Sequence, residues 1–363
     1  MRRLLTLNYG SSSLKFALFE EYKKLEYDVL SLNNEDDHKY ALLHILERYQ
    51  NEDLSFVVHR VVHGMGYKSP MLLDKEKLKL IKELTVVSPL HNTFATIGIE
   101  TVFEKMPWVS QYAVFDTSFH ATMPLHSSSY AIPRRFYEEG IKRYGFHGVS
   151  YSYLLKESSR LLKKDQHQLS MIMLHLGSGS SICAVHEGKS VDTSMGMTPL
   201  EGLIMSTRGG DLDPGIVLRL LKKGLSSEEV ERILYRESGL KGICGLSDMR
   251  QVIERVQEGD DMAELALSLY VYRIKKYIGA YHAVLPKLHA IVFSGGIGEN
   301  NPLIRSMVCK GLEKIGIIVD EEMNKQKDLP LIVNKPESKV KVLVIRTDEE
   351  LEMVSQVLSL VEK

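Results

Sequence analysis

The sequence predicts an α/β protein with an internal duplication. Short apolar segments with the length of buried strands alternate along the chain with longer segments of helical spacing, and this alternation is typical of layered α/β folds. An apolar segment, a Gly/Ser-rich turn and a second apolar segment occur at residues 4–19 and again at residues 171–185. Such a repeat indicates a duplicated domain, although two unrelated hairpins would give the same pattern.

The individual elements follow from apolar runs and from helical spacing. Buried strands are predicted at residues 4–7, 14–19, 55–60, 111–116, 171–174, 182–185 and 289–294. Helices are predicted at residues 74–84, 262–285, 302–315 and 351–361. The last helix has the clearest start, because residues 347–350 supply a cap residue and an acidic first turn.

The composition excludes several classes of protein. The formal net charge of −1 creates no overall field toward nucleic acid or an anionic membrane, so local arginines must hold any anionic substrate. The three cysteines lie far apart without a C-x-x-C pair, which predicts reduced thiols rather than a disulfide or a thiolate metal site. The first apolar run stops at Asn8, too early for a signal peptide, and no run reaches the ~18 residues of a membrane span. We therefore expect a cytoplasmic protein.

Two segments rich in small residues are candidates for binding phosphate. The turn at residues 8–13 offers backbone N–H groups and the hydroxyls of Ser11 and Ser13, with Lys15 close behind. Residues 294–300 follow a predicted strand and precede a helix with Pro302 near its start, so the backbone there can approach an anion closely. Neither segment matches a Walker A loop or a dinucleotide fingerprint, and an ordinary turn is the alternative for each.

Two arginines and two carboxylates stand at predicted element ends. Arg60 closes an apolar strand and Arg208 lies in a polar turn before a helix, and a guanidinium binds carboxylate or phosphate in a forked geometry. The structural alternative is that each arginine pairs with a nearby aspartate. Asp116 and Glu349 are candidates for anchoring Mg²⁺, directly or through water, with helix capping as the alternative.

The histidines show no metal-binding spacing. There is no H-E-x-x-H motif and no compact His/Cys cluster, so a zinc site is not expected. One or two histidines beside a reacting phosphate would suffice to donate hydrogen bonds there. The candidates beside glycines, prolines or strand ends are His59, His63, His91, His120, His147 and His175.

Taken together, these segments resemble the acetate kinase family of the actin and sugar-kinase superfamily. The matching segments are residues 8–15, 59–64, 89–92, 115–120, 144–148, 175–177, 192–202, 295–300 and 347–350. The resemblance implies an α/β fold of two duplicated actin/sugar-kinase-like (ribonuclease H-like) domains around a central cleft. We expect an N-terminal acetokinase domain of residues 1–117 and 350–363. Residues 118–349 would form the C-terminal domain for nucleotide binding and dimerisation.

The same resemblance implies a reaction and a set of partners. The chain would transfer the γ-phosphoryl group of ATP reversibly to acetate, giving acetyl phosphate and ADP. Mg²⁺ would be the metal ion, with Mn²⁺ as a substitute, and the enzyme would be a homodimer. Because acetate is already ionised at neutral pH, the reaction needs positioning and charge stabilisation rather than a general base.

Residue roles also follow from the resemblance. Arg60 and Arg208 would hold the substrate carboxylate and the phosphoryl group in flight, which His147 would also hydrogen-bond as a transition-state stabiliser. Asn8, Asp116 and Glu349 would position Mg²⁺ and the arginines. The implied substrate pocket is Arg60, Val62, Leu90, Phe146 and Pro199. The implied nucleotide-binding residues are Ser11, Ser13, Lys15, His175, Gly177, Ser178, Gly179, Ser180, Gly295, Gly296, Ile297, Gly298, Glu299 and Asn300.

The chain departs from the family pattern at a few positions and leaves alternatives open. Ser178 stands where asparagine is usual, and Tyr9 stands where a small residue is usual. A propionate or butyrate kinase is the main alternative, although Val62 favours the smaller acid. Pyrophosphate in place of ATP, a nucleotide-binding sensor without catalysis and an actin-like filament are further alternatives.

Overall fold

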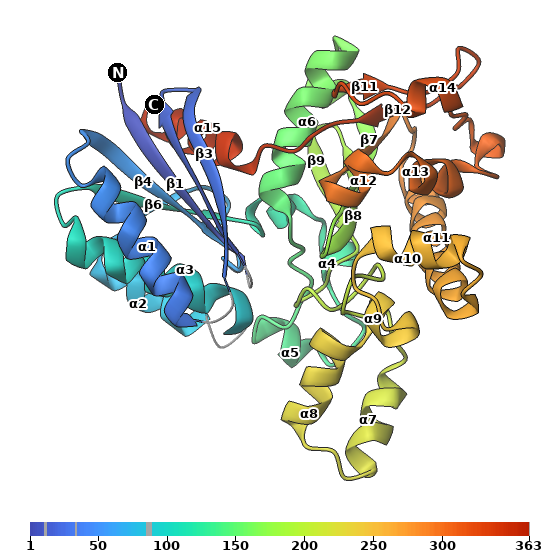
Figure 1. Ribbon diagram of the computed structural model, residues 1–363, viewed down its shortest axis with the longest axis horizontal. Helices are drawn as coiled ribbons and strands as arrows, with labels where there is room; N and C mark the ends of the chain where they lie inside the picture. Colours follow the sequence, from blue (N-terminus) through green and yellow to red (C-terminus); the bar gives the residue numbers. More distant parts are fainter. Residues whose placement is uncertain (11–12, 33–34, 85–88, 363) are drawn as a thin grey trace. The chain divides into compact units, whose positions relative to one another are not determined.

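The computed structural model describes residues 1–10, 13–32, 35–84 and 89–362, with only the backbone described at residues 35–36 and 89–91. Two compact units account for these residues (Figure 1). Unit 1 contains Met1–Ala121, Phe146–Tyr153 and Asp348–Lys363, and unit 2 contains Thr122–Gly145 and Leu154–Thr347. Each unit is built on one six-stranded sheet.

Unit 1 has a mixed sheet with helices on both faces. Its strands are β1 (Arg3–Tyr9), β2 (Ser13–Glu20), β3 (Lys23–Ser31), β4 (Leu54–Val61), β5 (Met71–Leu72) and β6 (Ser110–Phe115), in the order β3-β2-β1-β4-β6-β5. Helices α1 (Glu35–Tyr49), α2 (Lys75–Leu84) and α3 (Pro89–Lys105) pack on one face, through a core that includes Leu5, Leu7, Ile45 and Ile99. Helix α15 (Glu349–Val361) packs on the opposite face against Leu4, Val58 and Val114. The alternation of side chains along β1 and β4 explains how one strand serves both cores.

Unit 2 repeats this architecture. Its strands are β7 (Ser170–Leu176), β8 (Ser180–His186), β9 (Lys189–Thr193), β10 (Ala290–Ser294), β11 (Leu331–Ile332) and β12 (Lys341–Val344). The remaining helices are α4 (Leu125–Ser128), α5 (Arg134–Glu138), α6 (Gly148–Leu162), α7 (Pro214–Lys222), α8 (Ser227–Arg232), α9 (Gly239–Cys244), α10 (Met249–Gln257), α11 (Asp261–Val284), α12 (Gly295–Asn300), α13 (Pro302–Cys309) and α14 (Glu321–Asn324). Short 3₁₀ or π turns occur at Ser118–Thr122, Gln166–Gln168, Ile233–Glu237 and Glu313–Ile315. Helix α11 contributes Ala266, Tyr270 and Ile274 to the core of this unit.

The strand orders confirm the predicted duplication. The second sheet reads β9-β8-β7-β10-β12-β11, which matches β3-β2-β1-β4-β6-β5 position by position. In both sheets the first three strands of the order form an antiparallel meander. The third of them, β1 or β7, is parallel to the next two strands, and a short antiparallel strand closes the edge. Two unrelated hairpins would not share this whole topology, so the repeat is a property of the complete units.

One predicted helix is shorter than expected. Residues 302–315 do not form a single helix, because α13 ends at Cys309 and a separate 3₁₀ turn covers Glu313–Ile315. The chain leaves the helical conformation at Lys310, with φ of −56° and ψ of 124°, and Gly311 follows with φ of +83°, in the left-handed region that glycine adopts readily. The other predicted strands and helices are present within one or two residues of the expected positions. No helix in the described parts of the chain combines the length and the apolarity needed to cross a membrane.

Candidate active site

The predicted polar residues of unit 1 gather at one edge of its sheet. Strands β1, β4 and β6 are parallel neighbours, so their carboxyl ends lie at the same edge, where α/β proteins place ligand sites. Asn8 of β1 is paired with Arg60 of β4, and Asp116 directly follows the last residue of β6. The sheet therefore brings together three residues that are separated by about a third of the chain.

A guanidinium and a carboxylate form the centre of this cluster. Arg60 donates from Nε to Asp116 Oδ1 at 3.0 Å and from Nη2 to Oδ2 at 2.6 Å, which is a forked pair. Its Nη1 donates to the side-chain oxygen of Asn8 at 2.9 Å. Only 14% of the Arg60 side chain and 1% of the Asp116 side chain are exposed, so the pair is held in place rather than solvated.

The first turn of α15 adds two more carboxylates. The Asn8 amide nitrogen donates to Glu349 Oε2 at 3.0 Å and to Glu350 Oε1 at 2.9 Å. Asp348 caps the helix by accepting from the Leu351 N–H, which fixes where this acidic turn begins. Glu349 was predicted from the sequence, but Glu350 was not given a role there. Acidic residues are common in the first turn of any helix, so the local pattern did not distinguish Glu350 as a member of the cluster.

The cluster has more negative than positive charge. Glu349 and Glu350 are 6% and 5% exposed, so with Asp116 three buried carboxylates lie around the guanidinium of Arg60, and the positive charge of Lys15 also acts on Glu350. Burial works against the charged form of Arg60, but Asp116 and Glu349 raise its pKa above the usual range and keep it protonated. Burial, and next the charge of Glu349, raise the pKa of Glu350. This excess of carboxylate oxygens suits a hard divalent cation.

The donor set fits Mg²⁺ only when a substrate completes it. No three His, Cys, Asp or Glu side chains converge as a metal cage in the described residues. Asn8 and Asp116 are already engaged with Arg60, and Glu349 with Asn8. Mg²⁺ characteristically takes one or two carboxylates, several waters and the phosphates of its substrate. A protein site for Mg²⁺ therefore needs to supply only some of the ligands, as this cluster does.

His147 and Phe146 also belong to unit 1. The backbone of His147 hydrogen-bonds the Asp116 carboxyl group, and His147 has φ of +59°, which is uncommon for a residue other than glycine. The Phe146 carbonyl lies 2.9 Å from Nε2 of His120, and its ring meets that of His63 edge to face. Phe146 and Val62 are both buried. The structure thus ties the backbone of the predicted transition-state histidine to the predicted catalytic aspartate.

Tyr9, one of the departures from the family pattern, points into the core of unit 1. Its hydroxyl lies 3.1 Å from Nδ1 of His59, and Nε2 of His59 lies 2.8 Å from the side-chain oxygen of Gln111. Gly98 of α3 makes room for the ring, because a Cβ there would stand 2.0 Å from the Tyr9 hydroxyl oxygen. Since Asn8 and Tyr9 alternate on β1, this buried chain lies on the sheet face opposite the carboxylate cluster.

The buried imidazole of His59 leads to a pH prediction. Burial lowers the pKa of His59 to about 3, whereas an unfolded chain would titrate near 6.5. Between these values the unfolded state binds more protons than the folded state, so stability falls as the pH falls. Lowering the pH from 7 to 5 is expected to cost about 2 kcal/mol of unfolding free energy through this residue.

Urea unfolding at both pH values measures this effect in the wild type and in His59→Asn. Asparagine keeps a donor and an acceptor but does not titrate, so its loss of stability between pH 7 and pH 5 should be about 2 kcal/mol smaller. Comparing pH dependences removes any constant destabilisation that the substitution causes. Equal pH dependences in the two proteins would contradict the assignment of a neutral, buried His59.

Arg208 in unit 2 is held very differently from Arg60. Its Nη1 donates to the Pro199 carbonyl oxygen at 2.9 Å, and no carboxylate of the described residues lies within ion-pair distance. The nearby aspartates are engaged elsewhere: Asp211 accepts from the Tyr277 hydroxyl, and Asp213 caps α7. Burial lowers the pKa of Arg208 to about 10, which leaves a protonated guanidinium at neutral pH without an anion beside it.

Two of the segments that the family resemblance assigns to nucleotide binding, residues 177–180 and 295–300, follow neighbouring strands in unit 2. The β7–β8 turn carries Gly177 to Ser180, and residues 295–300 follow β10, the parallel neighbour of β7. Gly295 packs closely against the end of β7, directly before the turn, because a Cβ on Gly295 would stand 2.6 Å from the Leu176 carbonyl oxygen. The glycine run itself forms the short helix α12 rather than the open turn expected before a helix.

Two side chains, Glu299 and Arg305, bond the backbone of α12. Glu299 was expected to contact the nucleotide itself. The Glu299 carboxylate accepts from the N–H groups of Gly295 and Thr347, at 2.9 and 3.1 Å, so it is engaged in fixing the helix. Arg305 of α13 is buried and donates to the carbonyls of Gly298 and Glu299 at 2.8 and 2.9 Å. Arg305 was not predicted as a site residue, because nothing in the local sequence distinguishes it from a surface arginine.

Other expected site residues are distributed over both units. Ser13 and Lys15 lie on β2 of unit 1, with Lys15 opposite Asn8, and His175 lies on β7. Ser11 lies outside the described residues, and only the backbone of Leu90, in α3, is described. A largely apolar cavity of about 360 Å³ in unit 2 is bordered by Met197, Leu200 and Leu212, but by none of the predicted substrate residues. That cavity is therefore not the pocket expected for the acid.

Comparisons with known proteins give a consistent result. A model described as the acetokinase family matches residues 23–355. An acetate kinase of Campylobacter jejuni is 44% identical, over 97% of each chain. An acetate kinase structure from Porphyromonas gingivalis has a TM-score of 0.90 at 34% identity and covers 99% of this chain and 100% of that chain. A propionate kinase structure from Francisella tularensis has a TM-score of 0.90 at 35% identity and covers 98% and 99%.

Proposed function

The chain belongs to the acetokinase family and shares its fold of two duplicated actin/sugar-kinase-like domains, and from this premise we propose its reaction. The protein transfers the γ-phosphoryl group of ATP reversibly to acetate, forming acetyl phosphate and ADP. It is a phosphotransferase with a carboxylate as acceptor. ATP rather than pyrophosphate is the donor, because both predicted nucleotide segments are present and pack together in unit 2.

The observation that carries the proposal is the difference between the two arginines. Arg208 is a buried cation without an anionic partner among the described residues, which suits a group that receives an anion from solution. Arg60 is fixed by Asp116 and Asn8, which suits a group that must stay in one orientation. The reaction brings an anionic acid up to a polyanionic phosphate, and the two anions repel each other. One fixed and one unpaired guanidinium would together offset this repulsion.

The mechanism we propose is a direct in-line transfer. The carboxylate of acetate is already deprotonated, so it attacks the γ-phosphorus without a general base, and ADP leaves on the opposite side. Arg60 holds the acid, and Arg208 and His147 donate hydrogen bonds to the phosphoryl oxygens while charge builds up on them. Asp116 keeps the Arg60 fork in a single orientation through two hydrogen bonds.

A divalent cation is part of the proposal. Asn8, Asp116 and Glu349 provide the hard oxygen atoms that would hold Mg²⁺, with Mn²⁺ as a substitute. When bound, Mg²⁺ neutralises phosphate charge and orients the phosphate chain. Glu350 adds a fourth oxygen donor group to this cluster.

The nucleotide would be held by the segments that the sequence indicates. These are Ser11, Ser13, Lys15, His175, residues 177–180 and residues 295–300. Glu299 and Arg305 would act there indirectly, since both bond the backbone of α12. The methyl group of acetate would lie against Val62, Leu90, Phe146 and Pro199. A propionate kinase is the second candidate, because one solved relative with a TM-score of 0.90 carries that name.

Steady-state turnover with ATP and Mg²⁺ tests the function directly. Acetate, propionate and butyrate are compared, and the acyl phosphate is detected as its hydroxamate. We expect the highest kcat/KM with acetate and a value at least about 30-fold lower for butyrate, since each of its two additional methylenes costs ~1–3 kcal/mol in a tight pocket. Higher kcat/KM with propionate would move the substrate assignment to the second candidate. No turnover with any of the three acids would overturn the proposed activity.

Three further properties are proposed on the strength of the family. Residues 1–117 with 350–363 form the N-terminal acetokinase domain, and residues 118–349 form the C-terminal one. Two copies of the chain form a homodimer through the C-terminal domain. The enzyme is cytoplasmic, and its partners are the small molecules of the reaction rather than nucleic acid or membrane.

A further inference from the structure

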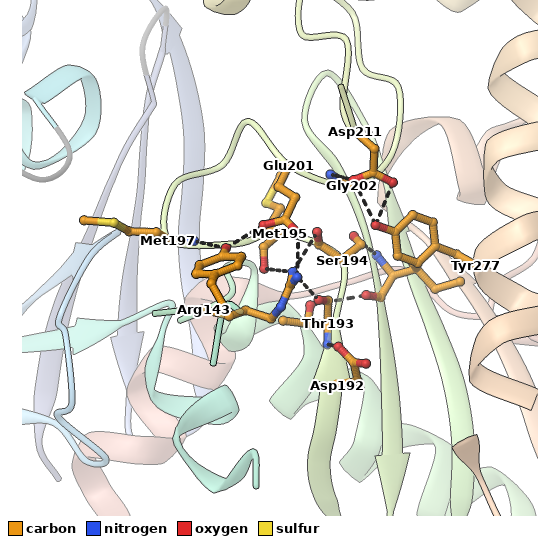
Figure 2. A network of polar contacts seen from close by, with 12 residues as sticks. Arg143, Asp192, Thr193, Ser194, Met195, Met197, Glu201, Gly202, Asp211 and Tyr277 are labelled. Carbon is orange, nitrogen blue, oxygen red and sulfur yellow. Dashed lines mark hydrogen bonds and ion pairs between the residues drawn. The ribbon is translucent and has the colours of Figure 1, made fainter. Parts of the chain in front are cut away.

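A partly buried ion pair in unit 2 involves the loop of residues 194–205, which carries Pro199. Arg143 follows α5 in the sequence, and its Nη2 bonds Glu201 Oε1 (Figure 2). Glu201 Oε2 accepts from the Tyr130 hydroxyl at 2.5 Å, and the Arg143 guanidinium lies 5.5 Å from the centre of the Tyr130 ring. Nothing in the proposed reaction uses these three side chains.

Two of these side chains, Arg143 and Tyr130, also bond the backbone before and within the loop. Nη1 of Arg143 donates to three successive carbonyls, those of Thr193, Ser194 and Met195, at 3.0, 3.2 and 3.1 Å. The Tyr130 hydroxyl accepts from the Met197 N–H at 3.0 Å. A planar guanidinium with several donors is the side chain best suited to gather backbone carbonyls in this way.

The packing around Gly196 shows how tightly the loop is held. A Cβ at this position would stand 1.9 Å from Glu201 Oε2 and 2.2 Å from the Tyr130 hydroxyl oxygen. The Gly196 carbonyl in turn accepts from the N–H groups of Tyr144 and Gly145, beside Arg143. The loop backbone therefore lies directly against the ion pair.

A second set of contacts closes the other end of the loop. The Gly202 N–H donates to Asp211 Oδ1 at 2.9 Å, and Arg273 donates to the Gly202 carbonyl at 2.8 Å. Pro199 lies between the two sets of contacts, two residues from Met197 and two from Glu201. Its carbonyl oxygen is the acceptor that Arg208 bonds at 2.9 Å.

We propose that Arg143, Glu201 and Tyr130 are positioning residues that hold the Pro199 carbonyl where it orients the Arg208 guanidinium. Arg208 has no carboxylate of the described residues to fix it, so its orientation depends on this neutral acceptor. An acceptor on an irregular loop directs a guanidinium only if the loop itself is rigid. The inference rests on the proposed function, because it assigns Arg208 to the reacting phosphoryl group.

Kinetics of three variants test this role. Arg143→Lys keeps the charge but loses the fork, and it is expected to lower kcat about 10²-fold, the scale of a misplacement near 1 Å. The KM for ATP should stay within about twofold, because Arg143, Tyr130 and Glu201 bond one another and residues 193–197 but none of the described residues 177–180 or 295–300. Tyr130→Phe removes one hydroxyl and should lower kcat about tenfold. Arg255→Ala, at an exposed ion pair with Asp260 in the same unit, is the control and should keep wild-type kcat.

Coupling to Arg208 separates positioning from a general structural defect. If Arg143 acts through Arg208, Arg143→Lys in an Arg208→Ala background should change kcat by less than about twofold. Independent losses that multiply in the double variant would overturn the proposal. A kcat for Arg143→Lys within about twofold of the wild type would overturn it as well.

Hydrogen exchange of the loop provides a readout that does not depend on turnover. Peptides covering residues 194–205 should exchange at least about tenfold faster in Arg143→Lys than in the wild type. Their exchange rates in Arg255→Ala should equal those of the wild type. Equal exchange rates in Arg143→Lys and the wild type would overturn the proposal that Arg143 holds the loop, even if the enzyme is active. An inactive wild type would overturn the proposed function, while the exchange comparison would still decide whether the ion pair holds the loop. Should Arg143→Lys fail to fold, Tyr130→Phe supplies the same three comparisons.

Discussion

Arg208→Ala is expected to lower kcat for acetyl phosphate formation by about 10³-fold while leaving the folded state nearly as stable as the wild type. The loss of rate is on the scale of an arginine that stabilises charge on a phosphoryl group in flight. The small effect on stability follows from its surroundings. The guanidinium is buried without a carboxylate of the described residues, so its removal relieves a desolvation cost and forfeits one hydrogen bond to Pro199.

Two measurements on the same preparation check this expectation. The hydroxamate assay gives kcat, and urea unfolding gives the free energy of unfolding, which should stay within about 1 kcal/mol of the wild type. Arg232→Ala is a suitable control, because Arg232 is an exposed arginine of the same unit, paired with Glu237 at 2.7 Å, and should affect neither quantity. A kcat within tenfold of the wild type would contradict the role assigned to Arg208. A large loss of stability would contradict the account of its environment.

Arg60→Ala is expected to lose activity and stability together. The rate should again fall about 10³-fold or more, because the cation that holds the acid is gone. In addition, Asp116 would be left as a buried carboxylate without its partner, and breaking such a pair typically costs 3–5 kcal/mol, so we expect about 3 kcal/mol or more. Glu349 and Glu350 would then repel Asp116 and each other with no positive charge from Arg60 between them.

The pH dependence of this variant provides an independent check. Without Arg60 the buried carboxylates have raised pKa values in the folded state, so folding takes up protons and the stability deficit should shrink as the pH is lowered from 8 to 6. Arg60→Lys is the matched variant: it restores the charge but not the fork, and should recover more stability than activity. If Arg60→Ala and Arg208→Ala lost equal stability, the distinction between a paired and an unpaired arginine would be wrong.

The architecture was largely predictable because it is encoded locally. Residues 171–174 and 290–293 are fully apolar runs that are followed within three residues by glycine or serine, which predicts buried strands whatever lies around them. The end of α13 was not predictable from periodicity, since the apolar spacing continues past Cys309 to Ile315. The backbone leaves the helix at Lys310, just before Gly311, and a single glycine in a helical pattern does not by itself indicate a helix end.

The candidate site was predictable in part for a similar reason. Asn8, Arg60 and Asp116 each end a predicted strand, and parallel strands carry their ends to one edge, so their convergence in unit 1 follows from topology. Glu350 and the Arg143–Glu201 pair were missed as functional groups. Their partners lie 342 and 58 residues away, and no local pattern specifies which distant residue a buried charge will meet.

The sequence by itself determined the fold class, the duplication and the family, because apolar periodicity and short motifs are properties of neighbouring residues. Only the tertiary structure decided what each charge is paired with. The same expectation, that an arginine pairs with a nearby aspartate, holds for Arg60 and fails for Arg208, although Asp211 and Asp213 follow Arg208 closely in the chain. Strand register delivers Asp116 to Arg60, whereas a helix cap and Tyr277 take the two aspartates away from Arg208. Charge pairing in a protein interior depends on which side chains the packing brings together, and that information is spread over the whole chain.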